Sequence, residues 1–275
     1  MPAPSCRVAA RPAMTGPAMT GDELTAGMPP LLTVQDASRR FPNGTVALAG
    51  VSLRVGAGEV VALLGPSGCG KSTLLRLIAG LDRPDGGAVT WSGGPPAPGS
   101  IGYVFPDATL LPWATAAENV RLPLRLRGRP AAASAPLVQA ALARVGLQGF
   151  GGARPRELSG GMRMRVSIAR ALVARPRLLL MDEPFAALDE FTRHALQEDL
   201  LALQRDEGCS VVFVTHSIYE AAFLARRVVL MSPRPGRIVD VLDAPLLPDA
   251  ARRLDPAYAA FVARITGAMA QARAA

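Results

Sequence analysis

The segment 65–73, with the sequence Gly-Pro-Ser-Gly-Cys-Gly-Lys-Ser-Thr, restricts what this chain can fold into more than any other feature. It matches the pattern G-x-x-x-x-G-K-[ST], in which glycines let the backbone curl and point several N–H groups at phosphate oxygens. Lys71 is the only lysine, and all the other basic residues among the 30 lysines and arginines are arginine. A compact ammonium fits between phosphate oxygens where a planar guanidinium does not, so the loop predicts a nucleotide-binding site.

The residues on either side of the loop have the patterns of the strand and helix that such a loop requires. Residues 59–64 form a short apolar run typical of a buried strand, and 71–79 place three apolar side chains on one helical face. The phosphates would then lie at a helix N-terminus, where unpaired N–H groups and the helix dipole favour negative charge. The sequence predicts nucleotide contacts from Gly65, Pro66, Ser67, Gly68, Cys69, Gly70, Lys71, Ser72 and Thr73.

Two adjacent carboxylates, Asp182 and Glu183, follow another apolar run at 177–181. In a phosphate-loop NTPase the first acid helps to hold Mg²⁺ together with the hydroxyl of the loop, which here is Ser72. The second acid can polarise the attacking water, because it projects from a strand end near the γ-phosphate. A structural cap is the alternative role for the pair. With a phosphate loop present, the pattern favours an ATP site with Mg²⁺ contacts from Ser72 and Asp182.

Strand-like runs recur along most of the chain, whereas about 107–175 has helical periodicity only. The predicted strands cover 31–35, 45–55, 59–64, 88–91, 101–105, 178–181, 211–215, 227–231 and 236–242. The predicted helices of the middle region cover 115–126, 135–145 and 161–173. Apolar strands after a glycine loop suit a mostly parallel sheet covered on both faces, so the sequence predicts an α/β fold interrupted by a helical insertion.

The two ends of the chain and its composition complete this picture. Residues 1–30 are rich in Ala, Pro, Met, Gly and Thr without periodicity, and we expect them to form a disordered extension. No apolar run approaches the roughly 20 residues that cross a bilayer, so we expect no transmembrane segment. Three scattered cysteines are too few for a disulfide framework or a zinc site.

The segment Leu158-Ser159-Gly160-Gly161 lies between the phosphate loop and the carboxylate pair. Ser159 is well placed to cap the helix that follows, and the glycines permit a close approach of the backbone. Together with the other two motifs it resembles the signature of the ATP-binding-cassette (ABC) ATPases over about 31–240. The resemblance implies a phosphate-loop NTPase with a mixed sheet core, an N-terminal antiparallel β portion, a helical subdomain at about 107–175 and a helical tail at 241–275.

The resemblance also implies roles for single residues. Phe41 resembles the aromatic residue that stacks on adenine, 187–189 with Asp189 resembles the D-loop, and His216 resembles the switch histidine that contacts the γ-phosphate. Two cassettes of this family pack head to tail, so the nucleotide held by one chain meets Ser159, Gly160 and Gly161 of the other. Glu183, His216 and Lys71 are then the expected catalytic residues, and we expect a dimer of identical subunits.

Further details resemble the nitrate/sulfonate/taurine importer branch of bacterial transporters, among them Leu-Pro-Trp at 111–113 and Met-Ser-Pro-Arg-Pro-Gly-Arg-Ile at 231–238. This resemblance implies an ATPase on the cytoplasmic face of the bacterial inner membrane. It would energise uptake of a small anionic or sulfonate-like solute through a separate permease, which an external solute-binding protein supplies.

One position departs from the family pattern. Members carry glutamine at the end of the strand that enters the helical insertion, where it reaches Mg²⁺ and the attacking water, but here Tyr103-Val104-Phe105 is followed by Pro106. Proline has no side-chain donor and fixes φ. We therefore expect Pro106 to weaken hydrolysis or coupling while ATP binding survives. A regulatory cassette that binds ATP and turns over poorly is an alternative interpretation.

Two other classes of protein compete with this interpretation. A net charge of +8 and an isoelectric point near 10.5 are compatible with an ABC-type ATPase that acts on nucleic acid or ribosomes. That class usually carries two cassettes or a long coiled coil, which this sequence lacks, so we expect no nucleic-acid partner. A GTPase would read guanine with Asn-Lys-x-Asp, yet the only lysine is already in the phosphate loop. A kinase would leave the Leu-Ser-Gly-Gly segment unexplained.

Overall fold

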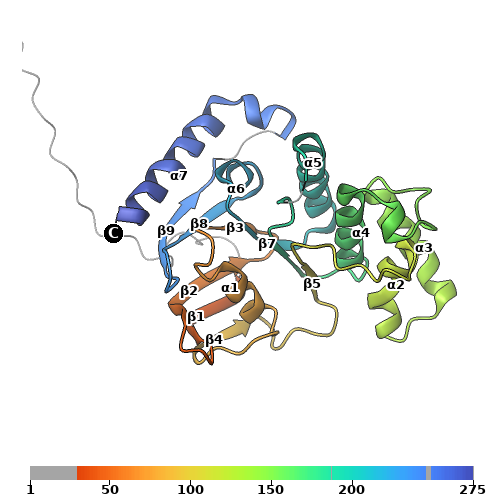
Figure 1. Cartoon of the computed structure of the whole chain (residues 1–275), viewed down its shortest axis with the longest axis horizontal. Helices are drawn as coiled ribbons and strands as arrows, with labels where there is room; N and C mark the ends of the chain where they lie inside the picture. The colour runs from red at the N-terminus through yellow and green to blue at the C-terminus, as the bar shows by residue number, and fades with distance from the viewer. Residues whose placement is uncertain (1–29, 187, 246–248, 275) are drawn as a thin grey trace, which may run out of the picture.

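The computed structural model describes residues 30–186, 188–245 and 249–274. Within this part of the chain an antiparallel sheet of three strands stands beside a mixed sheet of six (Figure 1). The small sheet has the order β2-β1-β4, with β1 Pro30–Arg40, β2 Val46–Gly56 and β4 Gly86–Trp91. The large sheet has the order β5-β6-β7-β3-β8-β9. Its strands are β5 Ile101–Val104, β6 Leu178–Asp182, β7 Ser210–Thr215, β3 Val60–Leu64, β8 Arg227–Met231 and β9 Ile238–Asp243.

The large sheet is parallel except for β9, and its central strands are buried on both faces. Alternate residues of β3 belong to different hydrophobic cores, because successive side chains of a strand point to opposite faces of the sheet. Val61 and Leu63 pack with α1 (Lys71–Ile78) and the antiparallel sheet. Ala62 and Leu64 pack toward the helices on the opposite face. Both faces are therefore covered, as parallel sheets require.

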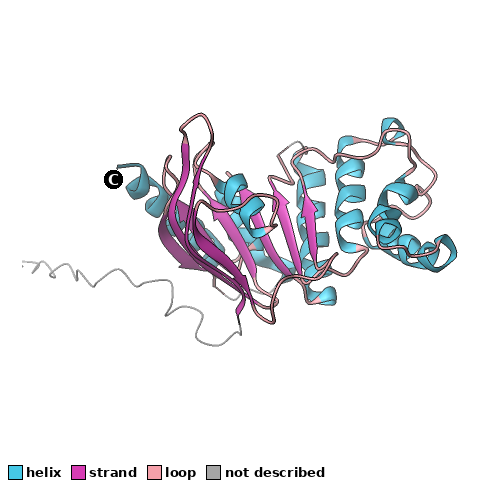
Figure 2. Ribbon diagram, turned by 90° about the horizontal axis from the view of Figure 1, so that it is seen from below, coloured by secondary structure: helices cyan, strands magenta, loops and turns pink. Residues whose placement is uncertain are grey.

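The helices form two groups (Figures 1 and 2). The helical insertion lies at one end of the large sheet and contains α2 Ala116–Leu126, α3 Ala131–Arg144, the short 3-10 helix Pro155–Glu157 and α4 Gly160–Leu172. The antiparallel sheet lies at the other end. The remaining helices are α5 Glu190–Glu207, α6 Ile218–Leu224, the 3-10 helix Asp249–Leu254 and α7 Pro256–Ala274, which packs against α6.

The expected α/β class, with a mixed sheet, an antiparallel N-terminal portion and a helical insertion, is confirmed. The expected extension at 1–30 lies outside the described residues except for Pro30, which begins β1. The domain limits remain predictions, although the limit at 240 falls inside β9. Within the described residues, no helix has both the length and the apolar character needed to cross a membrane.

Several predicted boundaries differ from the structure, among them the strand predicted at 31–35, which continues to Arg40, and two of the differences have identifiable reasons. The helix predicted at 135–145 begins at Ala131. Three alanines with high helix propensity precede Pro136 and extend the helix by about one turn toward its N-terminus. The strand predicted at 236–242 begins at Ile238, because 232–237 form a turn that the hydrogen bond from Ser232 N to the Arg237 carbonyl closes.

Candidate active site

The phosphate loop runs from the end of β3 to the start of α1, and its glycines are required by close contacts. A Cβ on Gly65 would lie 2.8 Å from the Met231 carbonyl oxygen, and one on Gly70 would lie 2.7 Å from that of Ala47. Gly70 is the N-cap of α1 with φ 107°, and no side chain caps the helix. The first N–H groups of α1 therefore have no side-chain acceptor and point where an anion binds.

Lys71 lies inside this loop, and its side chain is almost completely buried. Its ammonium donates to the carbonyl oxygens of Gly65 and Pro66, each at 2.8 Å. Both acceptors belong to the loop itself, so the positive charge is held at the centre of the curl. A phosphate at the helix N-terminus would meet this charge directly.

Ser72 and Asp182 come together as the sequence predicts for a metal site. The Ser72 hydroxyl donates to Asp182 Oδ1 at 2.8 Å, which joins the start of α1 to the end of β6. Burial raises the pKa of the Asp182 carboxyl, and the hydrogen bond from Ser72 opposes that shift. A hydroxyl and a carboxylate are the oxygen donors that Mg²⁺ prefers, and this ion usually takes its other ligands from phosphates and water. The pair fits that role, and no cluster of three or more His, Cys, Asp or Glu elsewhere in the described chain could hold a metal.

Glu183 and His216 lie close together just after the ends of β6 and β7. Glu183 has φ 47°, a left-handed conformation that is uncommon for a residue with a side chain, and its N–H donates to the Val214 carbonyl at 3.1 Å. Its Oε2 lies 3.3 Å from His216 Nδ1, which follows the neighbouring strand β7. Both side chains are partly exposed. Both groups are therefore accessible to water, and Glu183 lines the cavity beside the phosphate loop whereas His216 does not.

One cavity of about 370 Å³ joins the phosphate loop to Phe41. Phe41 follows β1, is half-buried and has the Arg39 guanidinium 5.8 Å from its ring centre. It remains a predicted platform for a base. The lining consists of Phe41, Asn43, Thr45, Ala47, Ser67, Gly68, Gly70, Lys71, Ser72, Thr73, Glu183 and Arg234. Four of these residues, Asn43, Thr45, Ala47 and Arg234, were not predicted from the sequence. The Ser-Pro-Arg-Pro-Gly turn was the only signal for Arg234.

The Leu-Ser-Gly-Gly segment does not line this cavity. Ser159 caps α4, as predicted, by accepting a hydrogen bond of 3.2 Å from Met162 N. A Cβ on Gly161 would lie 2.4 Å from Thr192 Cγ2, whereas Gly160 is exposed. Asp189 caps α5 by accepting from Thr192 N, a bond that lowers the pKa of its carboxyl. The structure therefore places these residues on a separate surface, and their contact with nucleotide remains a prediction.

Pro106 lies beyond the end of β5 and is exposed. Val104 pairs with Met181, the last pair between β5 and β6, so the segment that contains Pro106 begins next to the end of β6 that carries Asp182. Arg170 of α4 donates to the carbonyl oxygens of Ala108 and Thr109 at 2.8 Å each. The segment 106–109 is thus restrained at its start by the fixed φ of Pro106 and at its end by the hydrogen bonds from Arg170.

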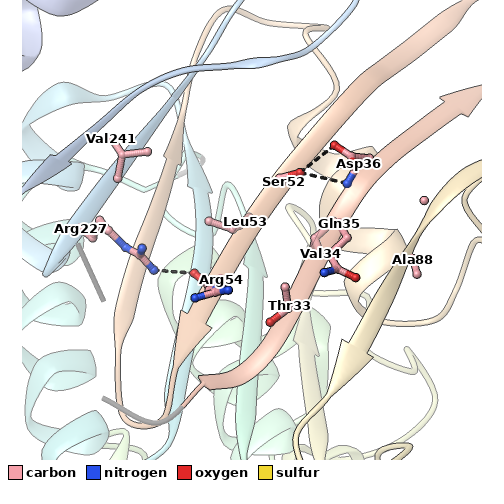
Figure 3. Close-up of a pocket in the computed structure, with 11 residues that line it drawn as sticks. Thr33, Val34, Gln35, Asp36, Ser52, Leu53, Arg54, Ala88, Arg227 and Val241 are labelled. Carbon is pink, nitrogen blue, oxygen red and sulfur yellow. Dashed lines mark hydrogen bonds between the residues drawn. The ribbon is translucent and has the colours of Figure 1, made fainter. Parts of the chain in front are cut away.

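A larger cavity of about 530 Å³ shares no lining residue with the phosphate loop (Figure 3). Its polar character comes from links between strands: Ser52 bonds to Asp36, and Arg227 donates to the Arg54 carbonyl. Arg227 is buried and forms an ion pair of 2.8 Å with Glu59. These groups connect strands and are paired with one another within the fold. We therefore propose no ligand and no reaction for this cavity.

Comparison with known proteins agrees with the geometry. The pattern of the ABC transporter family matches residues 48–186. The taurine import ATP-binding protein TauB of Chromobacterium violaceum is 52% identical over 217 residues, which cover 78% of this chain and 83% of that protein. An uncharacterized ABC transporter ATP-binding protein of Methanocaldococcus jannaschii is 47% identical over 218 residues, 77% of this chain and 81% of the relative.

Two solved structures share the fold. A dimeric ATP-binding cassette in a post-hydrolysis state with ADP and Pi matches with a TM-score of 0.69 and 32% identity, covering 78% of this chain and 100% of the other. The cbiO1 protein of Clostridium perfringens, part of an ABC transporter complex, matches with a TM-score of 0.71 and 29% identity, covering 78% and 88%.

Proposed function

This chain belongs to the ABC transporter family, and we propose that it is the ATPase subunit of an importer for a small sulfonate-like anion such as taurine. The observation that supports the importer assignment is the 52% identity to a taurine import ATP-binding protein over 217 residues. The ATPase activity itself follows from family membership and agrees with the arrangement of Lys71, Asp182 and Glu183.

The residues of the site have different roles in ATP binding and hydrolysis. The N–H groups of α1 and the Lys71 ammonium bind the phosphates of ATP, and Phe41 stacks on the base. Ser72 and Asp182 would hold Mg²⁺, which when bound would neutralise charge on the phosphates. Glu183 accepts a proton from the attacking water, and His216, 3.3 Å away, contacts the γ-phosphate and orients the carboxylate.

Lys71→Arg should weaken ATP binding, although arginine serves as the basic residue everywhere else. The buried ammonium donates to two loop carbonyls, an arrangement that a larger planar guanidinium does not reproduce, and losing a charge-assisted bond lowers affinity about tenfold or more. Calorimetric titration with ATP would measure the change. Arg76→Lys, a charge-conserving exchange at the far end of α1, serves as the control. An affinity equal to wild type would refute this role.

We further propose that two copies of the chain form the complete site, with Ser159, Gly160 and Gly161 of one copy covering the nucleotide of the other. The separation of this segment from the cavity supports the proposal, as does the dimeric state of the related cassette with ADP and Pi.

Mixing two inactive variants tests this shared site. A Glu183→Gln copy keeps its Ser159 segment and a Ser159→Arg copy keeps its carboxylate, so one site of each mixed dimer is intact. An equal mixture should recover about a quarter of the wild-type ATPase rate. Each variant alone should remain inactive. A mixture that stays inactive would contradict sharing between copies.

The permease partner, an external solute-binding protein and a location on the cytoplasmic face of the bacterial inner membrane follow from the importer proposal. Uptake of radiolabelled taurine by cells of the source organism tests it. Deletion of the gene should abolish uptake, the wild-type gene should restore it, and Glu183→Gln should not. Sulfate uptake is the control. If taurine uptake survives deletion, the solute assignment is wrong.

A further inference from the structure

The turn at 232–237, between β8 and β9, is fixed tightly against the phosphate loop. Gly236 N donates to the Ala47 carbonyl at 2.9 Å, and its own carbonyl accepts from Ala49 N at 3.0 Å. A Cβ on Gly236 would lie 2.1 Å from the carbonyl oxygen of Cys69. The turn is therefore held between β2 and the loop, and the Ser232 hydroxyl stabilises it from within by donating to the Pro233 and Pro235 carbonyls and accepting from Arg237 N.

This anchoring places the Arg234 side chain on the loop. Its Nε and Nη2 both donate to the Gly68 carbonyl, at 3.0 and 2.9 Å. Arginine carries five N–H groups in a planar fork, and these two bonds take two of them. The others have no acceptor within the described part of the chain, and Arg234 lines the same cavity as Phe41 and Lys71.

The order of the large sheet decides which side of the nucleotide Arg234 faces. Strand β3 carries the phosphate loop and lies between β7 and β8. Glu183 and His216 follow β6 and β7, so the groups assigned to the terminal phosphate come from one side. Arg234 follows β8 on the opposite side, next to β2 and the Phe41 platform.

We propose that Arg234 is a second cationic nucleotide-binding residue, which holds the phosphates of ATP that are not transferred. The proposal rests on the ATP site described above and adds a contact to it. The guanidinium keeps its two bonds to Gly68 and presents its other N–H groups to phosphate oxygens, a geometry that suits this planar fork. It binds substrate and product alike, so it contributes affinity and not rate.

Two substitutions separate the charge of Arg234 from its contact with the loop. Arg234→Gln keeps an amide donor for the Gly68 carbonyl and loses the charge, whereas Arg234→Lys keeps the charge. Arg237→Gln removes an exposed arginine from the same turn and is the control. Calorimetry would measure the Kd of ADP for each full-length variant, and that of ATP with Mg²⁺ in a Glu183→Gln background.

Arg234→Gln should weaken ADP and ATP by about tenfold each, as expected for one charge-assisted hydrogen bond. Its KM should rise while kcat stays unchanged, and its Kd should depend less on salt. Arg234→Lys, which keeps the charge but not the fork, should lose less affinity than Arg234→Gln, and Arg237→Gln should match the wild type. All variants should keep the wild-type thermal midpoint.

Several results would overturn the proposal. Unchanged affinity in Arg234→Gln, an equal loss in the Lys and Gln variants, or a loss for ATP without a loss for ADP would each exclude it. If the wild type binds and hydrolyses ATP while Arg234→Gln behaves identically, only the Arg234 contact fails. If the wild type binds neither nucleotide, the ATP site itself fails as well.

Discussion

Glu183→Gln is expected to reduce the rate of ATP hydrolysis by about 10² to 10⁴, the usual contribution of a general base. The amide cannot accept the proton of the attacking water, but it has the same shape as the carboxylate. ATP affinity should therefore remain close to wild type, because Lys71 and the N–H groups of α1 are unchanged. Release of phosphate under saturating ATP measures the rate, and calorimetry measures the affinity.

Asp206→Asn is the matched control for this experiment, since it removes an exposed carboxylate from α5, away from the cavity. It should hydrolyse ATP at the wild-type rate. If Glu183→Gln hydrolyses ATP as fast as this control, another group activates the water. The left-handed backbone of Glu183 would then need a different explanation.

Pro106→Gln is expected to increase ATP hydrolysis by up to about 10², because a side-chain amide can contribute as much as one donor to a developing charge. Pro106 follows the end of β5, next to the end of β6 that carries Asp182, so we expect an amide there to lie on the side of the terminal phosphate. The affinity for ATP should not change, since Pro106 does not line the nucleotide cavity. Steady-state kinetics would separate kcat from KM.

Pro106→Ala separates the two properties of the proline. It releases the fixed φ but supplies no polar group, so it should leave the rate near wild type. An equal increase in both variants would show that stiffness of the segment limits hydrolysis. No increase in the glutamine variant would disprove the role given to Pro106 and weaken the interpretation as a poorly hydrolysing regulatory cassette.

Sequence analysis could predict the parts of the site that depend on short segments. The contact between Ser72 and Asp182 was expected, because a phosphate loop and a strand ending in carboxylates meet at one edge of a parallel sheet. The cap formed by Ser159 was expected from its position before a helical pattern. In each case the local sequence determines both the element and its end.

Arg234 could not be predicted in this way. Its contact joins Gly68 to a turn far along the chain, and it exists only because β8 pairs with β3 and Gly236 lies against Cys69. The start of α3 was missed for a local reason, since the alanines at 131–133 extend the helix to the N-terminal side of Pro136. Contacts between distant segments and competing local preferences are settled by the packed structure.

The Lys71 ammonium donates to the carbonyls of Gly65 and Pro66, and a ligand must compete with these two bonds to bind it. A ligand forms a hydrogen bond with the Lys71 ammonium only if its oxygens attract the ammonium more strongly than the two neutral carbonyls do. Phosphate oxygens carry full negative charge and meet this condition. A nucleoside without phosphates offers only neutral acceptors, so it cannot engage the lysine even where its base could stack on Phe41. The loop thus discriminates by charge before any catalytic group takes part.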